Sequence, residues 1–326
     1  MKKIGWVGAL AGFLMLRAVF SHAASDLKTV KMVIPRGSTF VLSYFGARDA
    51  GIFRKYGIDV DVDSRPFAGF MAGLPSRQVL VGTYAGLNAI EQMNQGKDLI
   101  VIGGGLTSMQ DVWVLKDSPL QKLSDLKGKK FGVWSRGAGA TKALEVLSVD
   151  GFKLDLNKDV QTIEIAGPAL MALLDKGDVD AMFNLSSLSI AAASQPEKYR
   201  LLFSPDDYWR EKTGAPLVWS APTIAWKDWI DEDRERAKNV VEALHESWRW
   251  LRQNSDKAVE KYGKLAGVQN PAEAATLKKM LQAGGIFLDK WDPKIVDAQW
   301  KFLDLAKQVG IIKAVPAKDK YSLILR

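Results

Sequence analysis

The chain of 326 residues contains no cysteine and only two histidines. Without cysteine it can form neither a disulfide nor a thiol nucleophile, so its stability must come from burying apolar side chains. One histidine, His22, lies in an N-terminal segment that we expect to be removed, which leaves His245. This composition excludes zinc sites of the usual kind and argues against a Ser-His-Asp triad.

His245 lies in an amphipathic helical pattern over residues 231–253, near Glu242, Glu246 and Arg249. A histidine in such surroundings is typical of a solvated helix face. We therefore interpret His245 as a solvated surface residue and not as a catalytic one.

The chain also has little excess of charge. Its formal charge of +8 falls to +5 when Lys2, Lys3 and Arg17 are removed with the N-terminal segment. The basic residues are spread along the chain and are not clustered with aromatic residues, as a nucleic-acid groove requires. The sequence predicts no nucleic-acid partner and at most a weak preference for anionic ligands.

The N-terminus has the three parts of a secretory signal. Lys2 and Lys3 form a basic start, residues 4–16 are apolar, and Ser21-His22-Ala23 fits a cleavage site with small residues. Arg17 interrupts the apolar run, which makes it a poor membrane span. We predict a cleaved signal peptide over residues 1–23 and an exported mature chain; the alternative is an uncleaved N-terminal anchor. No cysteine follows to carry a lipid.

Strands and helices are predicted to alternate along the mature chain, a pattern typical of α/β folds with helices on both faces of mainly parallel sheets. The expected strands are 30–34, 58–62, 79–82, 99–102, 111–115, 130–134, 161–165, 179–183 and 222–226. The expected helices are 38–50, 85–95, 141–149 and 168–177, followed by amphipathic helices over 231–253, 271–283 and 293–309.

Two apolar strands, 111–115 and 222–226, have no helix beside them and look like crossings between two lobes. They predict that lobe II, residues 114–221, is inserted into lobe I, residues 24–113 and 222–326. Paired hinges of this kind let two lobes close over a ligand in the cleft between them.

Four polar turns follow strands, at the sheet edge where α/β folds bind ligands. Helix N-termini there offer unpaired N–H groups and partial positive charge, and two arginines add forked donors suited to carboxylate or sulfonate oxygens. Aromatic side chains near these turns can form an apolar wall. The predicted ligand-binding residues are Arg36, Ser38, Thr39, Phe40, Gly69, Phe70, Thr83, Tyr84, Trp134, Arg136, Gly137, Thr141, Asn184, Ser186 and Trp219. The alternative for Ser38 and Thr141 is that they only cap helices.

Motifs for catalysis are incomplete. Ser124 and Lys127 match S-x-x-K and residues 212–214 match K-T-G, but the serine enzymes that use them need that serine to open a helix. Gly128 follows at once and a strand is expected two residues later, so we expect no helix there. The phosphate-binding pattern G-x-x-x-x-G-K-[ST] is absent, and residues 137–142 only begin a G-x-G-x-x-G pattern.

Three segments resemble a known family. Residues 50–60, residues 115–130 and the stretch Lys176-Gly177-Asp178-Val179-Asp180-Ala181 are similar to bacterial periplasmic solute-binding proteins of ABC importers. The nearest branch is the nitrate/sulfonate/taurine type, and D-L-K-G-K-K at residues 125–130 is the most specific part. The resemblance covers essentially the whole mature chain. It implies a type II fold of two α/β lobes joined by a two-strand hinge.

The resemblance also implies capture without catalysis: a monomer that binds a small anionic ligand in the periplasm and delivers it to an inner-membrane ABC permease. No cofactor and no metal are expected. Residues 82–85 and 184–186 depart from the family's usual turns, so a specific ligand is not carried over. Thiamine-pyrimidine synthases resemble the same family, but they call on cysteines that this chain lacks.

We therefore predict a binding protein for a sulfonate or a carboxylate, with an aromatic or other apolar body. The alternatives are an exported sensor that presents its solute to a membrane receptor and an exported serine hydrolase.

Overall fold

The computed structural model describes residues 27–107, 109–165, 167–184, 186–317 and 325. The predicted signal peptide, residues 1–23, lies outside these residues and stays a prediction. Within the described part, no helix is long and apolar enough to cross a membrane.

Two small sheets form the part of the molecule that we call lobe I. β1 (Lys28–Pro35) and β2 (Ile58–Arg65) pair in parallel. In the second sheet, β10 (Ala221–Trp226) lies between β3 (Val81–Thr83) and β4 (Leu99–Leu106) and runs antiparallel to both. The strand predicted at 222–226 therefore returns into the centre of this sheet.

A five-stranded sheet forms lobe II. Its order is β7 (Gln161–Glu164), β6 (Lys130–Val133), β8 (Ala181–Phe183), β5 (Val112–Leu115) and β9 (Tyr199–Phe203). β6 is parallel to both its neighbours, whereas β5 is antiparallel to β8 and β9. Each lobe thus takes in one antiparallel strand, and these two are the strands predicted as crossings.

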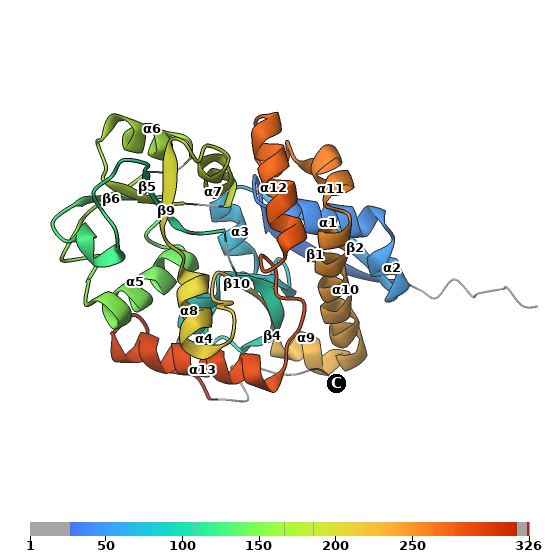
Figure 1. Ribbon diagram of the computed structural model, residues 1–326. Helices are drawn as coiled ribbons and strands as arrows, with labels where there is room; N and C mark the ends of the chain where they lie inside the picture. Colours follow the sequence, from blue (N-terminus) through green and yellow to red (C-terminus); the bar gives the residue numbers. More distant parts are fainter. Residues whose placement is uncertain (1–26, 108, 166, 185, 318–324, 326) are drawn as a thin grey trace, which may run out of the picture.

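Helices cover both lobes, and Figure 1 shows α13 lying beneath the two. The helices of lobe I and the C-terminal part are α1 (Phe40–Asp49), α2 (Ile52–Lys55), α3 (Phe67–Gly73), α4 (Gly86–Asn94), α9 (Lys227–Glu232), α10 (Arg234–Gln253), α11 (Ser255–Tyr262), α12 (Pro271–Ala283) and α13 (Pro293–Gln308). Those of lobe II and the return are the 3₁₀ helix η1 (Leu123–Leu126), α5 (Gly139–Phe152), α6 (Ala169–Lys176), α7 (Ser186–Ala193) and α8 (Pro205–Thr213).

Apolar burial explains both cores. All eight residues of β4 are buried, which accounts for its unbroken apolar run. Glycines in β4 allow it to approach β10 closely, because a Cβ on Gly105 would lie 1.9 Å from the carbonyl oxygen of Ala221. A separate cluster, which includes Phe131, Leu144 and Phe183, fills lobe II.

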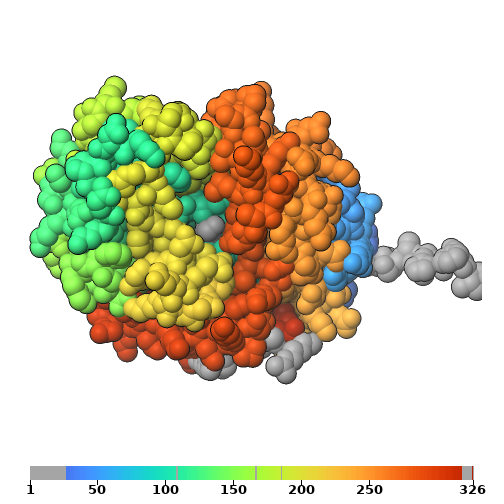
Figure 2. All heavy atoms as spheres, viewed as in Figure 1, coloured from blue at the N-terminus to red at the C-terminus, as the bar shows by residue number. Residues whose placement is uncertain are grey.

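The chain passes between the lobes in residues 107–111 and 204–220. β5 lies wholly in the lobe II sheet and β10 wholly in the lobe I sheet, so the predicted boundaries at 113/114 and 221/222 each fall inside a strand. We propose these two connecting segments as the boundaries between the lobes. In Figure 2 the green and yellow residues of lobe II and the orange C-terminal helices lie on either side of a furrow.

Two sequence expectations about single residues are wrong. His245 is buried on α10, with its ring 5.5 Å from that of Trp248. The face of α10 that carries His245 is buried against the rest of the protein. The helical spacing of apolar residues shows that one face is buried but not how wide that face is. Ser124 lies in a helical turn after all, although η1 is a single 3₁₀ turn that ends before Gly128.

Candidate functional site

A small cavity lies where the two lobes meet. Its volume is about 50 Å³, room for a few water molecules or a small polar group. The lining residues come from both lobes: Pro35, Ser38, Phe40, Phe67, Phe70, Ala85, Leu106, Gln110, Trp134, Ala138, Gly139, Ala140, Ser186, Ser220 and Ala221.

Four helices begin at this cavity, two from each lobe. The lining includes Phe40 at the start of α1, Ala85 at the N-cap of α4, Gly139 at the start of α5 and Ser186 at the start of α7. The first N–H groups of a helix have no partner within that helix, and the helix dipole makes its N-terminus partly positive. The cavity therefore collects positive potential without any cationic side chain.

The local sequence gives these N-termini little side-chain capping, although the first N–H of α4, at Gly86, already donates to the carbonyl of Trp219 at 3.2 Å. None of the four helices has an acidic residue in its first turn, and α1, α4 and α5 have no side-chain cap. By contrast, α8, α10, α12 and α13 each start with a side-chain oxygen that accepts a backbone N–H, at Ser204, Asp233, Asn270 and Asp292. However, α2, α6, α9 and α11, which contribute no residue to the lining, also lack a side-chain cap, so a missing cap permits an external anion at the cavity but does not single out its four helices.

The described residues that line the cavity include no Asp, Glu, Lys or Arg. Its polar groups are three serines, Gln110 and the indole of Trp134, together with the backbone. A neutral lining with converging helix N-termini is suited to a single negative charge. It offers no carboxylate to a ligand that also carries a positive charge.

Aromatic rings from both lobes form one wall. The ring of Phe67 in α3 meets that of Trp134 edge to face at 4.7 Å, across the lobe interface. Phe70 lies behind Phe67 at 6.1 Å and also contacts Tyr84. Such a wall supplies apolar surface to the body of a ligand held by its charge.

Two polar atoms of the lining residues are buried without a hydrogen-bond partner. They are Nε1 of Trp134, whose side chain is 5% exposed, and Oε1 of Gln110. An unpaired buried polar group costs about 1–3 kcal/mol, so native structures usually leave one only for a reason. A ligand that accepts from the indole would relieve part of this cost.

Specific contacts join the lobes beside the cavity. Asn88 in α4 donates through Nδ2 to the carbonyl of Gly137 at 3.0 Å, and Lys142 in α5 pairs with Glu91 in α4 at 2.5 Å. A Cβ on Gly139 would lie 3.1 Å from that of Ala85, so a larger residue at the start of α5 would crowd α4. The lobes are therefore close together in this structure.

Of the fifteen residues predicted from sequence, the structure places Ser38, Phe40, Phe70, Trp134 and Ser186 in the cavity lining. Six more of the predicted residues lie within a few positions of lining residues along the chain: Thr39, Thr83, Tyr84, Gly137, Thr141 and Asn184. Gly69 is in α3 between two lining residues. Their role as ligand residues stays a prediction.

The capping alternative for two hydroxyls does not match their contacts. Oγ of Ser38 donates to the carbonyl of Pro35 at 2.6 Å, and Oγ1 of Thr141 donates to that of Ser135 at 2.6 Å. Both hydroxyls tie the turn that leads into the helix, and neither accepts a backbone N–H. Thr39 occupies the N-cap position of α1 as expected, but its side chain makes no capping hydrogen bond.

The two predicted arginines lie outside the lining. Arg36 is exposed and reaches the carbonyl of Ser64 at 3.4 Å, while Arg136 is exposed and donates to that of Thr162 at 3.0 Å. Trp219 is fully buried and stacks on Phe302 of α13 at 6.0 Å. The role of Arg36, Arg136 and Trp219 as ligand residues stays a prediction that this arrangement does not favour.

The prediction missed several lining residues. Gln110 belongs to the connection between the lobes, where no strand or helix pattern gives it a direction. Ala85, Ala138, Gly139 and Ala140 carry no side-chain chemistry, but their position before or at the start of a helix is a readable signal. A helix that starts without a cap or an acid, directly after a strand, is that signal.

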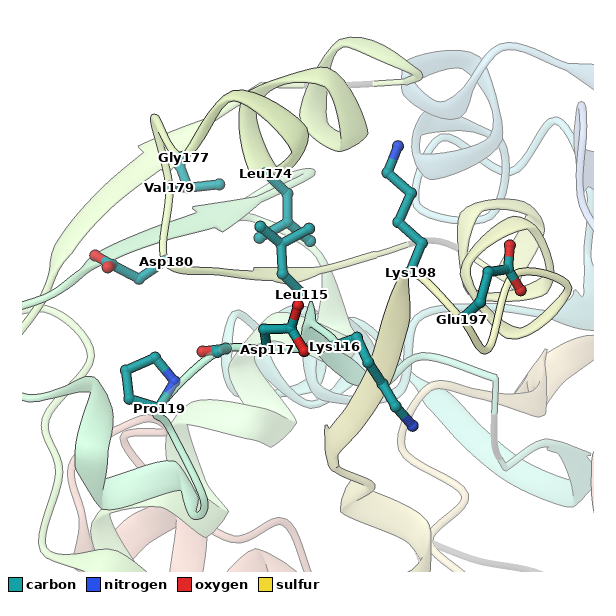
Figure 3. Close-up of a pocket in the computed structure, with 11 residues that line it drawn as sticks. Leu115, Lys116, Asp117, Pro119, Leu174, Gly177, Val179, Asp180, Glu197 and Lys198 are labelled. Atoms are coloured by element: carbon teal, nitrogen blue, oxygen red, sulfur yellow. The ribbon is translucent and has the colours of Figure 1, made fainter.

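A larger groove of about 470 Å³ lies elsewhere on lobe II and has a different character. Figure 3 shows it between Pro119, Leu174, Asp180 and Lys198, with charged groups of both signs directed apart. Lys198 is paired with Asp175 at 2.7 Å. The groove is open and none of its side chains converge on one point, so the cavity between the lobes is the better candidate.

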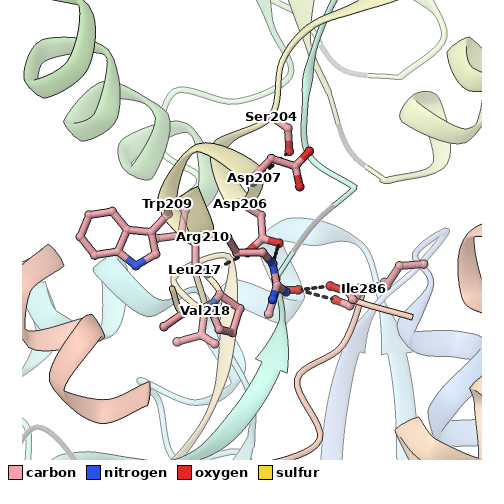
Figure 4. Close-up of polar contacts among 12 residues, drawn as sticks. Ser204, Asp206, Asp207, Trp209, Arg210, Leu217, Val218 and Ile286 are labelled. Atoms are coloured by element: carbon pink, nitrogen blue, oxygen red, sulfur yellow. Dashed lines mark hydrogen bonds and ion pairs between the residues drawn. The ribbon is translucent and has the colours of Figure 1, made fainter. Parts of the chain in front are cut away.

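A cluster of carboxyl groups lies at the connections between the lobes. Figure 4 shows Asp206 between Arg210 and the backbone N–H of Leu217, which donate at 2.5 and 2.7 Å. Burial raises the pKa of Asp111 to about 7, with Ser204 opposing the shift and the charges of Asp207 and Asp206 adding to it. Near neutral pH the residue next to Gln110 therefore carries only part of a negative charge, which limits its repulsion of an anion.

Two α/β lobes, an antiparallel strand inserted in each, and a cavity between them define a two-lobed periplasmic binding protein fold. The predicted fold class is confirmed. The chain belongs to the family described as NMT1/THI5 like, which matches residues 38–258. This family assignment confirms the resemblance found in the sequence.

Solved structures support the fold. The periplasmic aliphatic sulphonate binding protein SsuA of Escherichia coli has a TM-score of 0.72 at 15% identity, over 92% of this chain and 93% of that one. The alkanesulfonate-binding protein SsuA of Xanthomonas axonopodis pv. citri, bound to MOPS, has a TM-score of 0.67 at 15% identity, over 91% and 99%. No curated protein matches the sequence.

An enzyme shares the same fold. A cysteine-to-serine mutant of the desulfurization enzyme DszB, in complex with biphenyl-2-sulfinic acid, has a TM-score of 0.60 at 15% identity, over 91% of this chain and 97% of that one. The fold alone therefore does not separate binding from catalysis, and the residues of the site must decide.

Proposed function

We propose that the protein is the periplasmic substrate-binding component of an ABC importer that captures a small organic anion, a sulfonate or a carboxylate, and delivers it to an inner-membrane permease. The observation that carries this proposal is the meeting of four uncharged helix N-termini, two from each lobe, at one cavity. Because each lobe supplies half of the donors, an anion there favours the closed arrangement of the lobes.

The names of the structural neighbours support the same ligand class. The protein from Escherichia coli is described as binding aliphatic sulphonates and that from Xanthomonas as binding an alkanesulfonate. The cavity volume of about 50 Å³ limits the size of the ligand. It suits a small charged group on a short chain better than one on a large aromatic body. The aromatic wall would then pack against a short aliphatic chain.

The site residues favour capture over catalysis. The solved DszB mutant replaces a cysteine, and this chain has none. His245 is on α10, outside the lining, and the lining residues include no carboxylate, histidine or lysine that could act as a general base. The three serines of the lining therefore lack the partner that would activate them.

The direct test is a ligand panel on the purified mature chain, read by thermal shift. Short alkanesulfonates, short carboxylates, nitrate, sulfate and uncharged alcohols of equal length are compared at matched ionic strength. A ligand at about 100 times its Kd adds about 2.7 kcal/mol to the free energy of unfolding. We expect organic monoanions alone to raise the melting temperature.

The proposal fails if no organic anion shifts the melting temperature, or if the alcohols shift it equally. Product analysis by NMR after overnight incubation with each bound compound tests the enzymatic alternative. Recovery of unchanged ligand is expected, and turnover would overturn the assignment as a binding protein.

A further inference from the structure

The lining of the cavity combines three features that narrow its ligand beyond an organic anion. It holds no charged side chain, it has an indole N–H without a partner at Trp134, and it has a carboxamide at Gln110 whose oxygen is buried and unpaired. The absence of charged side chains bears on which ligands the site rejects. The two unpaired polar atoms bear on which hydrogen-bonding groups a ligand should bring. All three are independent of the helix N-termini.

Because the lining has no carboxylate, the site should select against ligands that carry a positive charge. A ligand with an ammonium group next to its anion would bury that cation where no side-chain carboxylate of the lining can pair with it. Burying a charge without a hydrogen-bonded counterion is costly, and the helix N-termini add a partial positive charge that repels it. The site is therefore expected to reject zwitterions such as amino sulfonates and amino acids.

Gln110 should select for a ligand that carries a hydroxyl group over one that carries only an alkyl group. A carboxamide has an acceptor oxygen and a donor nitrogen, and its oxygen here has no partner in the described part of the chain. A hydroxyl both donates and accepts, so it satisfies either end of the carboxamide. An alkyl group satisfies neither and leaves the desolvated amide unpaired.

Trp134 fits the same arrangement. Its indole N–H is a donor only, so its missing partner is an acceptor such as an oxygen of the anionic group. Trp134 comes from lobe II, and Gln110 comes from the connection that leads into β5. A short ligand with an anion at one end and a hydroxyl at the other would supply partners to both.

Resting on the proposed function, we infer that the preferred ligand is a short hydroxylated organic monoanion, with Gln110 as the residue that selects the hydroxyl. Its recognition needs no arginine and no carboxylate. The helix N-termini and Trp134 hold the charged head, and Gln110 holds the neutral polar end.

Two matched series test this inference by calorimetry. Ethanesulfonate, 2-hydroxyethanesulfonate and 2-aminoethanesulfonate share a two-carbon body and differ only at one end. Propionate, 3-hydroxypropionate and 3-aminopropionate repeat the comparison with a carboxylate. In the better-binding series we expect the hydroxylated member to bind about tenfold tighter than the plain one and at least tenfold tighter than the amino one.

A variant separates selection from general damage. In Gln110→Leu the preference for the hydroxylated member over the plain one should disappear, because leucine offers the hydroxyl no hydrogen-bond partner. A purely structural role for Gln110 would weaken both ligands equally. If Gln110→Leu is unstable, Gln110→Met is the second variant, because its flexible side chain has nearly the same length.

The outcomes are distinct from those of the ligand panel. Equal or tighter binding of the plain or the amino member overturns the inference and leaves the proposed function intact. Binding of another organic anion of the panel when all six of these probes fail has the same meaning. Failure of every anion overturns the proposed function itself.

Discussion

At the residue scale, the cavity is lined by neutral groups, among them an indole and an amide, and not by charged side chains. Arg36 and Arg136 are the obvious anion ligands in the sequence, yet each donates to a backbone carbonyl at the surface. Trp134 is buried at the cavity with its N–H unpaired. A neutral donor fixed by packing can serve an anion better than an exposed cation, because its electrostatic effect is not screened by water.

Replacing the indole tests this point. Trp134→Phe keeps an aromatic ring against Phe67 but removes the donor, and we expect ligand affinity to fall by about 1.5–3 kcal/mol, the range for a hydrogen bond to a charged group. Isothermal calorimetry measures it. The control is Trp209→Phe, because Trp209 also has a buried indole N–H without a partner but packs on Phe302 away from the cavity. Equal losses in both variants would remove Trp134 from the site.

His245 makes a separate prediction about acid stability. Burial lowers the pKa of His245 to about 4, with Arg249 adding to the shift and Asp289 opposing it. Between about pH 6.5 and pH 4 the unfolded chain binds a proton there that the folded chain does not, so this residue reduces stability as the pH falls.

Between pH 7 and pH 4.5 we expect the free energy of unfolding to fall more in wild type than in His245→Leu. The difference between the two falls should be on the order of 2 kcal/mol. Urea unfolding at the two pH values measures this difference, and it cancels the titration of carboxyl groups that both proteins share. A wild-type loss no larger than that of the variant would show that His245 is not buried in the neutral form.

At the element scale, the helices begin in two ways. Some start with a capping side chain, as α12 does at Asn270 and α13 at Asp292. Others start without a capping side chain or a first-turn acid, and these include α1, α4 and α5 at the cavity as well as α2 and α6 away from it. Each missing cap sacrifices about 1 kcal/mol of helix stability, which a bound anion can restore.

The start of α5 offers a steric test. Gly139→Ala should favour the helix by its propensity but places a methyl group 3.1 Å from Cβ of Ala85 and 3.2 Å from Oδ1 of Asn88. We expect ligand affinity to fall about tenfold by calorimetry, because α5 can no longer approach α4, while the unliganded melting temperature stays equal or rises.

Gly137→Ala is the matched control, since a Cβ there meets only Oγ of Ser135 at 3.8 Å. If Gly139→Ala binds as tightly as this control, the close fit of α5 against α4 is not needed for binding.

At the scale of the whole molecule, binding is a matter of how the two lobes meet. Lobe II has a core cluster of its own, whereas the larger cluster also takes in Ala143, Val146 and Leu147 of α5, and the chain passes between the lobes in two connections. The ion pair between Lys142 and Glu91 and the hydrogen bond from Asn88 to Gly137 exist only while the lobes are together. These contacts are therefore part of the free energy of closure and hence of the apparent affinity.

Lys142→Met removes the ion pair across the lobes, and we expect it to weaken ligand binding by about 1 kcal/mol. Lys158→Met is the control, because Lys158 pairs with Asp155 at 2.8 Å within lobe II. Small-angle scattering should show compaction on ligand addition in wild type and the control, with a higher ligand concentration needed in Lys142→Met. The same half-saturation in all three would show that this pair plays no part in closure.

Much of the architecture could be predicted from the sequence, because the signals are local. The alternation of apolar and polar residues in β2 and the N-terminal proline of α12 predicted these elements closely. The prediction missed α7, α8 and β9, which have short or weakly periodic patterns. Their burial comes from neighbours distant in the sequence, as where Trp209 of α8 packs on Phe302 of α13.

The sequence by itself determined the α/β class and the absence of thiol chemistry, because composition and strand-to-helix periodicity depend on neighbouring residues. The family was indicated by the resemblance of three segments to a known family. It also located the turns at strand ends. Only the tertiary structure decided which groups meet at the cavity: it directed Arg36 and Arg136 to the surface, buried His245 and added Gln110. A side chain's partners across the lobes depend on packing between segments far apart in the chain, and no local pattern records that packing.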